Sequence, residues 1–219
     1  ILYLPKVWNA LSPPENLPDI LRKSPSDKSD FTFCSFNNFQ KMSDRTINVW
    51  SNILKNSGSK LMLKDSLKGG EDIKNNVLNK FTSHGVKEDQ IIFLERQKDR
   101  LEHLKLYNKA DVALDTFPYP GVTTTYEAIL MGLPVITMKG FNFNSRCGES
   151  ININVGMPEL IANDDEDYLK KALDLKIEKN LNEKYGINLR NKALASPLFD
   201  TDQFTKDFEN LLIEVNQQK

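Results

Sequence analysis

The chain has 219 residues, and its 29 Lys and Arg against 30 Asp and Glu give a formal net charge of -1. This balance excludes binding to nucleic acid or to an anionic membrane through bulk charge. A hydrophobic fraction of 39% is enough to bury a core, and no apolar run approaches the roughly 20 residues of a membrane span. We therefore expect one large or two small globular domains, with neither nucleic acid nor a membrane as partner.

The cysteines give a first indication of the compartment. Cys34 and Cys147 lie far apart and outside any CxxC spacing. This pattern predicts neither a disulfide framework nor a Cys-rich zinc site, and it favours a reducing, cytoplasmic environment. The chain starts at Ile1 with no leader signature, so we expect a piece of a longer protein.

The first 30 residues differ in composition from the rest of the chain. Residues 5–30 are rich in Pro, Ser, Asp and Lys, which favours irregular or extended backbone. We therefore predict that residues 1–30 form an extended lead-in or linker and that residues 31–219 form one lobe. The first strand of this lobe is predicted at 31–36, where side chains of high β propensity stop at Asn37 and Asn38.

Helix and strand signals then alternate along the chain. Helices are predicted from Asp44, as a capping residue, to near Gly58, from Asp72 to Gly85, and over 100–109 and 124–131. Further strands are predicted at 61–63, 91–94, 112–115 and 134–137. The last third, 164–192 and 201–217, is predicted to be helical, and we interpret the apolar stripe of the final helix as a packing surface. Five strands separated by helices indicate an α/β fold, a Rossmann-like parallel sheet with helices on both faces.

The loop after residue 115 is the most informative candidate site. Ligands of open α/β sheets bind at the carboxyl ends of the strands. Here Gly121 is followed by three hydroxyl side chains, Thr123, Thr124 and Thr125, at the start of a predicted helix. Unpaired N–H groups and the positive end of the helix dipole could hold a diphosphate there. Ordinary helix capping is the alternative, but three hydroxyls exceed what one cap needs.

Two further groups could face the same region. Glu127 lies about one turn inside the predicted helix and could accept hydrogen bonds from a ribose diol, although an exposed helical Glu is usually only solvated. Arg100 and His103 are spaced to share one helix face, while Leu101 and Leu104 could point into the core. The polar pair could therefore line the same cleft.

Several segments resemble one enzyme family. The run EAILMGLPVI at 127–136 resembles the E-A-x-x-x-G-x-P-V signature of GT-B glycosyltransferases, which bind nucleotide sugars with two Rossmann-like domains. FCSFNN at 33–38, LDTFPY at 114–119 and SPLFD at 196–200 resemble the protein O-GlcNAc transferases and SPINDLY-like proteins of glycosyltransferase family 41. Such proteins join tetratricopeptide repeats to an amino-terminal catalytic lobe and a carboxyl-terminal donor lobe. The resemblance covers the donor lobe.

The resemblance also implies roles for individual residues. Lys41 would neutralise the distal phosphate of UDP and stabilise the leaving group, and Glu127 would bind the donor ribose. The remaining substrate-binding residues that the resemblance implies are Asn38, Lys98 through its backbone, Arg100, His103, Gly121, Thr123, Thr124 and Thr125. Arg146, Gly148 and Ser150 would shape the cleft, or else form a helix start with Arg146 paired to Glu149.

The implied function is that of a UDP-sugar-binding lobe. It would serve an inverting transferase that moves GlcNAc from UDP-GlcNAc to Ser or Thr hydroxyls, with no metal and no cofactor besides the donor. The general acid-base residue and the acceptor groove are expected in a lobe outside this chain. Pro120 and Val122 depart from the family pattern and remove one expected donor contact. Three alternatives stay open: a lobe that binds GDP-fucose, a non-catalytic nucleotide-binding scaffold, and a flavodoxin-like phosphate-binding domain.

Overall fold

The computed structural model describes residues 2–21, 31–64 and 70–217. A six-stranded sheet lies at its centre, with the strand order β3-β2-β1-β4-β5-β6 and parallel pairing between all neighbours. This is the strand order of the Rossmann fold, in which the chain changes direction across the sheet between β3 and β4. The predicted Rossmann-like α/β fold is confirmed.

The elements follow one another in regular alternation. The strands are β1 (Thr32–Ser35), β2 (Lys60–Leu63), β3 (Ile91–Phe93), β4 (Val112–Leu114), β5 (Val135–Met138) and β6 (Ile161–Ala162). The helices are α1 (Asp44–Ser57), α2 (Glu71–Ser83), α3 (Arg100–Lys105), α4 (Thr123–Leu130), α5 (Cys147–Asn154), α6 (Asp165–Ile177), α7 (Leu181–Lys184), α8 (Gly186–Leu194) and α9 (Thr201–Gln217). Short 3-10 turns, among them η2 (Phe39–Lys41) and η4 (Leu106–Lys109), complete several of the connections.

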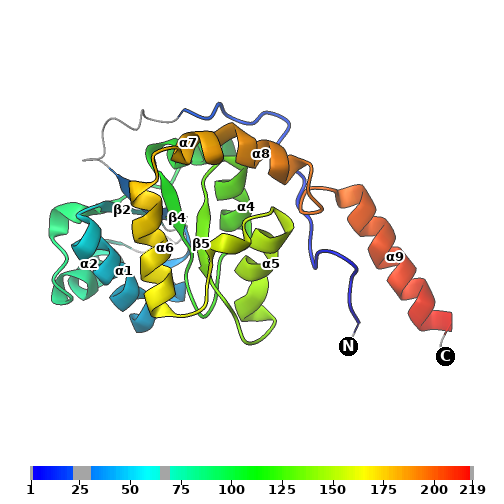
Figure 1. The fold of residues 1–219 in the computed structure, drawn as a ribbon, viewed down its shortest axis with the longest axis horizontal. Helices are drawn as coiled ribbons and strands as arrows, with labels where there is room; N and C mark the ends of the chain where they lie inside the picture. Colours follow the sequence, from blue (N-terminus) through cyan, green and yellow to red (C-terminus); the bar gives the residue numbers. More distant parts are fainter. Residues whose placement is uncertain (1, 22–30, 65–69, 218–219) are drawn as a thin grey trace.

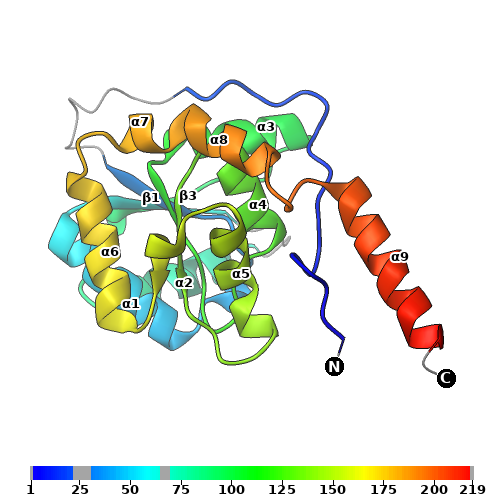
Figure 2. The same cartoon turned by 45° about the vertical axis from the view of Figure 1, so that its right-hand side comes forward.

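Helices cover both faces of the sheet. Figures 1 and 2 show α1, α2 and α6 on one side and α4, α5 and α8 on the other. Within these layers α1 packs against α6, and α4 packs against α8. Two covered faces explain why every residue of β1, β4 and β5 is buried, as expected of parallel strands covered on both sides.

The packing of α1 follows from the spacing of its apolar residues. Ile47, Trp50 and Leu54 recur at helical spacing, and each is at most 2% exposed. Burial of such side chains stabilises the fold by about 1.5 to 3 kcal/mol each. Ser43 caps the start of the helix, and Gly58 ends it in a left-handed conformation at φ 64.

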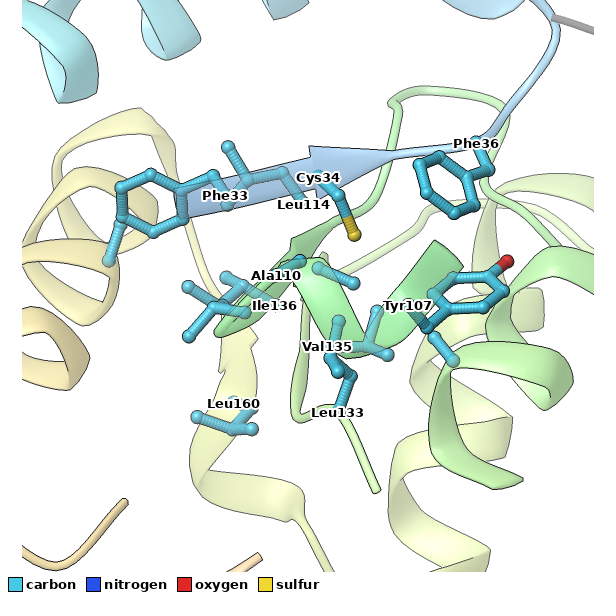
Figure 3. Close-up of a cluster of buried hydrophobic side chains, with 14 of the residues drawn as sticks. Phe33, Cys34, Phe36, Tyr107, Ala110, Leu114, Leu133, Val135, Ile136 and Leu160 are labelled. Atoms are coloured by element: carbon cyan, nitrogen blue, oxygen red, sulfur yellow. The ribbon is translucent and has the colours of Figure 1, made fainter. Parts of the chain in front are cut away.

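Part of the core lies directly beneath the carboxyl end of β1. Figure 3 shows Cys34 of β1 and Leu114 of β4 among side chains that also include Phe36 and Tyr107. The rings of Phe36 and Tyr107 have centroids 4.5 Å apart. The Tyr107 hydroxyl donates a hydrogen bond to the carbonyl oxygen of Thr124 at 3.2 Å. The core is thus tied directly to the start of α4.

Four details differ from the sequence-based expectation. Strand β6 was not predicted, because it has only two residues, and the sequence allowed helix α5 only as one of two alternatives, because its first turn contains Gly148, a poor helix former. The helix expected at 164–192 is divided into α6, α7 and α8, with a turn near Asn180, a residue type that favours turns. The cap of α1 is Ser43 rather than Asp44, because the Ser43 side chain accepts the hydrogen bond from the first turn.

The segment 2–21 contains no helix or strand and lies along the lobe. The backbone N–H of Leu11 donates to the carbonyl oxygen of Leu198 at 3.0 Å, and the Tyr126 hydroxyl donates to Asn9. The Arg190 guanidinium donates to the carbonyl oxygen of Pro18 at 2.7 Å. The rest of the predicted lead-in, residues 22–30, lies outside the described residues.

Helix α9 extends away from the rest of the lobe (Figures 1 and 2). Phe204 in its first turn packs against the core, but no residue of Thr201–Gln217 is buried, and Phe208 and Leu212 are each 46% exposed. The interpretation of its apolar stripe as a packing surface within this lobe is therefore wrong. The stripe could not reach the core, because the helix leaves the lobe after its first turn.

Candidate functional site

The predicted site residues gather at the carboxyl ends of β1 and β4. In this strand order, the two strands are neighbours at the point where the chain changes direction across the sheet. A crevice at such a point is where open α/β sheets bind their ligands. The loop 36–42 after β1 and the loop 115–122 after β4 meet there, since the Lys41 ammonium donates to the carbonyl oxygen of Pro120 at 3.0 Å.

The loop after β4 is fixed at both of its ends. At the first end the carbonyl oxygen of Phe117 accepts hydrogen bonds from the hydroxyls of Ser43 at 2.8 Å and Thr46 at 2.7 Å. At the other end the backbone N–H of Gly121 donates to the Asp115 carboxylate at 2.6 Å. The loop is therefore pre-organised before any ligand arrives.

Gly121 is required by close packing. A Cβ atom at this position would lie 2.5 Å from Oγ1 of Thr124 and 2.8 Å from both Oγ1 of Thr125 and Oδ1 of Asn37. Real Cβ atoms are not found so close to other heavy atoms, so a larger residue would displace the first turn of α4. Close packing therefore explains why a glycine occupies position 121.

The start of α4 carries no side-chain cap. Its N-cap residue is Val122, which has no side-chain hydrogen bond to the helix, so the alternative that the threonines simply cap it is not what the structure shows. Thr123 is exposed and Thr125 is buried, and the Thr124 hydroxyl donates to Oδ1 of Asn37 at 2.8 Å. An uncapped helix start presents N–H groups and the positive end of the helix dipole, an arrangement suited to an anion.

Lys41 lies beside this helix start at the end of η2. It is half-buried, and its ammonium lies 4.2 Å from the ring centroid of Tyr119. Burial lowers the pKa of Lys41, and the nearby negative charge of Asp115 opposes that change. A partly desolvated ammonium group interacts more strongly with an incoming anion than a fully solvated one. Asn38 caps η2 by accepting a hydrogen bond from the backbone N–H of Gln40 at 2.9 Å.

A second cluster lies one turn further along α4. The Glu127 side chain is 8% exposed, and its Oε2 lies 3.0 Å from Nε2 of His103. The Arg100 guanidinium lies 3.8 Å from the other carboxylate oxygen. The ring of His103 also contacts Phe36 at 5.8 Å and Tyr107 at 5.6 Å between centroids. The carboxylate is thus held in a fixed direction beside an aromatic wall.

Six of the predicted site residues therefore form two groups, and the others lie around them or apart from them. Lys41, Gly121 and Thr124 form the first group around the uncapped helix start, and Arg100, His103 and Glu127 form the second. Lys98 is exposed in the loop before α3, and among the described residues the structure gives no contact between it and either group. Leu104 is buried as expected, but Leu101 is 39% exposed and does not point into the core.

The segment after β5 shows which of two alternatives, a cleft wall or a helix start, applies to Arg146. Nε of Arg146 lies 3.0 Å from Oε2 of Glu149 at the start of α5, so the helix-start interpretation holds for this pair. A Cβ at Gly148 would lie 2.6 Å from Oδ2 of Asp115, and the residue therefore permits close packing of α5 against the β4 loop. Ser150 is partly buried within α5.

Sequence reasoning missed the residues that support the site from below. Asp115 is 1% exposed and is bonded to Asn37 and Thr137 as well as to Gly121. A carboxyl group directly after the apolar strand β4 was the available signal, since a buried charge there needs a set of fixed donors. In the sequence Asn37 stands out only as a residue that ends a strand and as part of the FCSFNN segment, so its hydrogen bond to Asp115 could not be inferred.

A sequence comparison over most of the chain shows its family. The sequence model of glycosyl transferase family 41 matches residues 23–208. The chain belongs to this family.

Curated relatives in family 41 cover most of this chain. A protein of Eustoma exaltatum subsp. russellianum, named probable UDP-N-acetylglucosamine–peptide N-acetylglucosaminyltransferase SPINDLY, is 33% identical over 179 residues, which are 81% of this chain and 20% of that protein. The corresponding SEC protein of Arabidopsis thaliana is 34% identical over 187 residues, 84% of this chain and 18% of that protein. The chain thus spans about a fifth of the length of these relatives.

Solved structures agree with the family assignment. A mutant of the Thermobaculum terrenum O-GlcNAc transferase superposes with a TM-score of 0.81 at 28% identity, over 91% of this chain and 38% of that one. Sucrose-phosphate synthase from Thermosynechococcus elongatus has a TM-score of 0.61 at 15% identity, over 88% and 47% of the two chains, a likeness of fold alone. The expected fold, a lobe of a GT-B glycosyltransferase, is confirmed.

The described residues hold neither a cluster of metal-binding side chains nor a membrane-spanning helix. Over residues 2–21, 31–64 and 70–217, His, Cys, Asp and Glu side chains form no group of three or more that could hold a metal ion. No helix in the same part of the chain has the length and apolar character needed to cross a membrane.

Proposed function

We propose that this family 41 chain is the donor-binding lobe of an inverting protein O-glycosyltransferase, and that its donor is UDP-GlcNAc. The observation that carries the proposal is the pairing of an uncapped helix start, flanked by Lys41, with the buried carboxylate of Glu127 one turn away. One helical turn is about 5.4 Å, a separation suited to neighbouring phosphate and ribose groups. The names of the relatives, which include UDP-N-acetylglucosamine, support this choice of donor.

In this proposal the diphosphate is bound by positive potential from the protein. The Lys41 ammonium and the backbone N–H groups of Thr123, Thr124 and Thr125 would stabilise the negative charge that develops on the leaving UDP. Gly121 would allow the close approach of the loop. No metal and no further cofactor is required, because these groups supply the charge that a divalent cation would otherwise provide.

Nucleoside binding would involve the second cluster. Glu127 would accept hydrogen bonds from the ribose diol, held in place by its contact with His103 at 3.0 Å. His103 and Arg100 would lie beside the base, and the backbone at Lys98 would bind its edge. Asn38 would contact the phosphate or the sugar from the η2 turn.

The transfer step would need groups beyond this chain. A Ser or Thr hydroxyl of the acceptor protein would attack the anomeric carbon, the bond from this carbon to the phosphate oxygen would break, and UDP would leave with the electron pair. The hydroxyl proton would pass to an acid-base residue in the other lobe, and tetratricopeptide repeats would bind the acceptor. The short share of the relatives that this chain spans is consistent with this division.

We place the reaction in the cytoplasm. Cys34 and Cys147 are buried and form no disulfide, which suits a reducing compartment.

Calorimetric titration with UDP-GlcNAc, GDP-fucose and UDP tests the proposal. We expect UDP-GlcNAc and UDP to bind, and we expect Lys41→Ala to weaken both by about ten- to a hundredfold, the worth of one charged hydrogen bond. Lys192→Ala removes an exposed lysine of α8 and serves as the matched control, with no expected effect.

The outcomes separate the candidate functions. Preference for GDP-fucose over UDP-GlcNAc would replace the proposed donor with the alternative one. Equal affinities of the unchanged chain and Lys41→Ala for UDP would refute the role of Lys41. If none of the three compounds bound, the proposed function would be refuted.

A further inference from the structure

The carboxyl group of Asp115 lies beneath the loop that leads into α4, out of reach of a ligand. The residue is 1% exposed. Its Oδ1 accepts hydrogen bonds from the backbone N–H of Gly121 at 2.6 Å and from Nδ2 of Asn37 at 3.2 Å, and its Oδ2 accepts one from the Thr137 hydroxyl at 3.0 Å. Such a carboxylate fixes the groups around it, because each of them would otherwise lose a buried hydrogen bond.

These bonds reach the first turn of α4 through Asn37. Oδ1 of Asn37 accepts a hydrogen bond from the Thr124 hydroxyl at 2.8 Å, so one side chain connects Asp115 to the helix start. The space around the network is full, since a Cβ at Gly148 would lie 2.6 Å from Oδ2 of Asp115. Asp115 therefore holds both Gly121 and the helix start from their buried side.

The charge of Asp115 is stabilised by Lys41. Burial raises the pKa of Asp115 to about 6, although its hydrogen bonds and the Lys41 charge act in the opposite direction. Cys147 of α5 and Tyr168 of α6 lie near enough to feel the charge of this carboxyl group, and burial together with that charge raises the pKa of each. Both stay neutral near pH 7, so Asp115 and Lys41 are the members of this group that carry charge.

We infer that Asp115 is a positioning residue for the diphosphate-binding loop, and that donor binding is coupled to the uptake of up to one proton by its carboxylate. The inference rests on the proposed function. A diphosphate beside Lys41 would engage the positive charge that stabilises the Asp115 carboxylate and would add negative charge nearby, and both effects favour the protonated form.

The hydrogen-bond partners of the two Asp115 carboxylate oxygens decide which oxygen takes up the proton. Both partners of Oδ1 are N–H groups, which can only donate, whereas the Thr137 hydroxyl at Oδ2 can turn and accept. The proton would therefore come from the buffer and settle on Oδ2. It would return to the buffer when the diphosphate leaves.

Proton counting by calorimetry tests this coupling. The chain is titrated with UDP-GlcNAc at pH 7 in buffers of different ionisation enthalpy, and the dependence of the heat on the buffer gives the protons taken up. A nucleotide sugar is the suitable probe, because its diphosphate is esterified at both ends and does not itself titrate near pH 7. Because the carboxyl group of the free chain is mostly ionised at pH 7, we expect a net uptake of protons, at most about one per UDP-GlcNAc bound.

Two substitutions of Asp115 separate charge from shape. In Asp115→Asn the amide oxygen can still accept from Gly121 and the amide nitrogen can donate to Thr137, so the variant mimics the protonated form. We expect it to bind UDP-GlcNAc within about fivefold of the unchanged chain but to take up less than about 0.1 proton. Asp115→Ala removes the network and should bind more than about tenfold more weakly, with folding checked by circular dichroism. If the Asp115→Ala chain does not fold, the proton count of Asp115→Asn decides.

Lys192→Ala, which removes an exposed lysine of α8, is the control, and we expect it to take up as much proton as the unchanged chain. Uptake that persists in Asp115→Asn would overturn the inference. So would binding of UDP-GlcNAc without any uptake. Absence of UDP-GlcNAc binding by the unchanged chain would instead refute the proposed function on which the inference rests.

Discussion

A buried carboxyl group such as that of Asp115 makes stability depend on pH in an unusual direction. Because burial raises its pKa to about 6, the folded chain binds a proton that the unfolded chain has already released. The stabilisation from this proton is fully present below the unfolded pKa of about 4 and is lost as the pH rises through about 6. Most carboxyl groups that are paired in folded proteins act in the opposite direction.

This property predicts how Asp115→Asn changes the free energy of unfolding. Relative to the unchanged chain, the variant should gain up to about 3 kcal/mol between pH 4 and pH 7, because it has no charge to bury at the higher pH. Urea denaturation of both chains across this range measures the difference. The comparison cancels the contributions of other groups, among them Asp44 and Asp167, whose pKa values are lowered by their hydrogen bonds. A difference that stays constant with pH would contradict the assignment.

At the scale of elements, the loop before α4 and the helix itself depend on one glycine. Gly121→Ala would place a methyl group 2.5 Å from Oγ1 of Thr124, so we expect a loss of about 1 to 3 kcal/mol in stability and weaker UDP binding. Gly70→Ala is the matched control, because no atom lies within 4 Å of a Cβ there and its φ of -62 suits alanine. It should change stability by less than about 1 kcal/mol. Similar effects of the two substitutions on unfolding and on titration with UDP would refute the steric role of Gly121.

In helix α9 we expect substitutions of apolar residues to change the stability little, because these side chains are exposed. Phe208 is 46% exposed, and Phe208→Ser should therefore change the free energy of unfolding by less than about 0.5 kcal/mol. Leu189 of α8 is 1% exposed, and Leu189→Ala should cost about 2 to 5 kcal/mol. Thermal and urea denaturation compare the two. A large loss for Phe208→Ser would show that α9 packs against the lobe after all.

For the molecule as a whole, the sequence predicted those features that depend on local periodicity. Helix α1 and the central strands were found because their apolar residues recur at regular spacing and end at turn formers such as Gly58. Strand β6 was missed because it is too short to show a period, and the sequence allowed helix α5 only as one of two alternatives, because Gly148 in its first turn is a poor helix former. The direction taken by α9 depends on tertiary packing, which no periodicity reports.

For the site, too, the residues in local sequence patterns could be predicted, and those brought together by the fold could not. Gly121 and the three threonines could be found as a run in the sequence, helical spacing pointed to Glu127 and to the pair Arg100 and His103, and the family resemblance added Lys41. The support from Asp115 and Asn37 could not, because the hydrogen bond between them joins residues 78 positions apart. Only the parallel pairing of β1 with β4 brings them together.

The affinity of the unchanged chain for UDP relative to uridine tests whether a diphosphate binds at Lys41 and the uncapped start of α4. Two charged hydrogen bonds to the diphosphate there would be worth about 3 kcal/mol or more. Calorimetric titration should therefore show UDP binding at least about a hundredfold more tightly than uridine. Equal affinity for UDP and uridine, or no detectable binding of UDP, would show that this site does not bind the diphosphate.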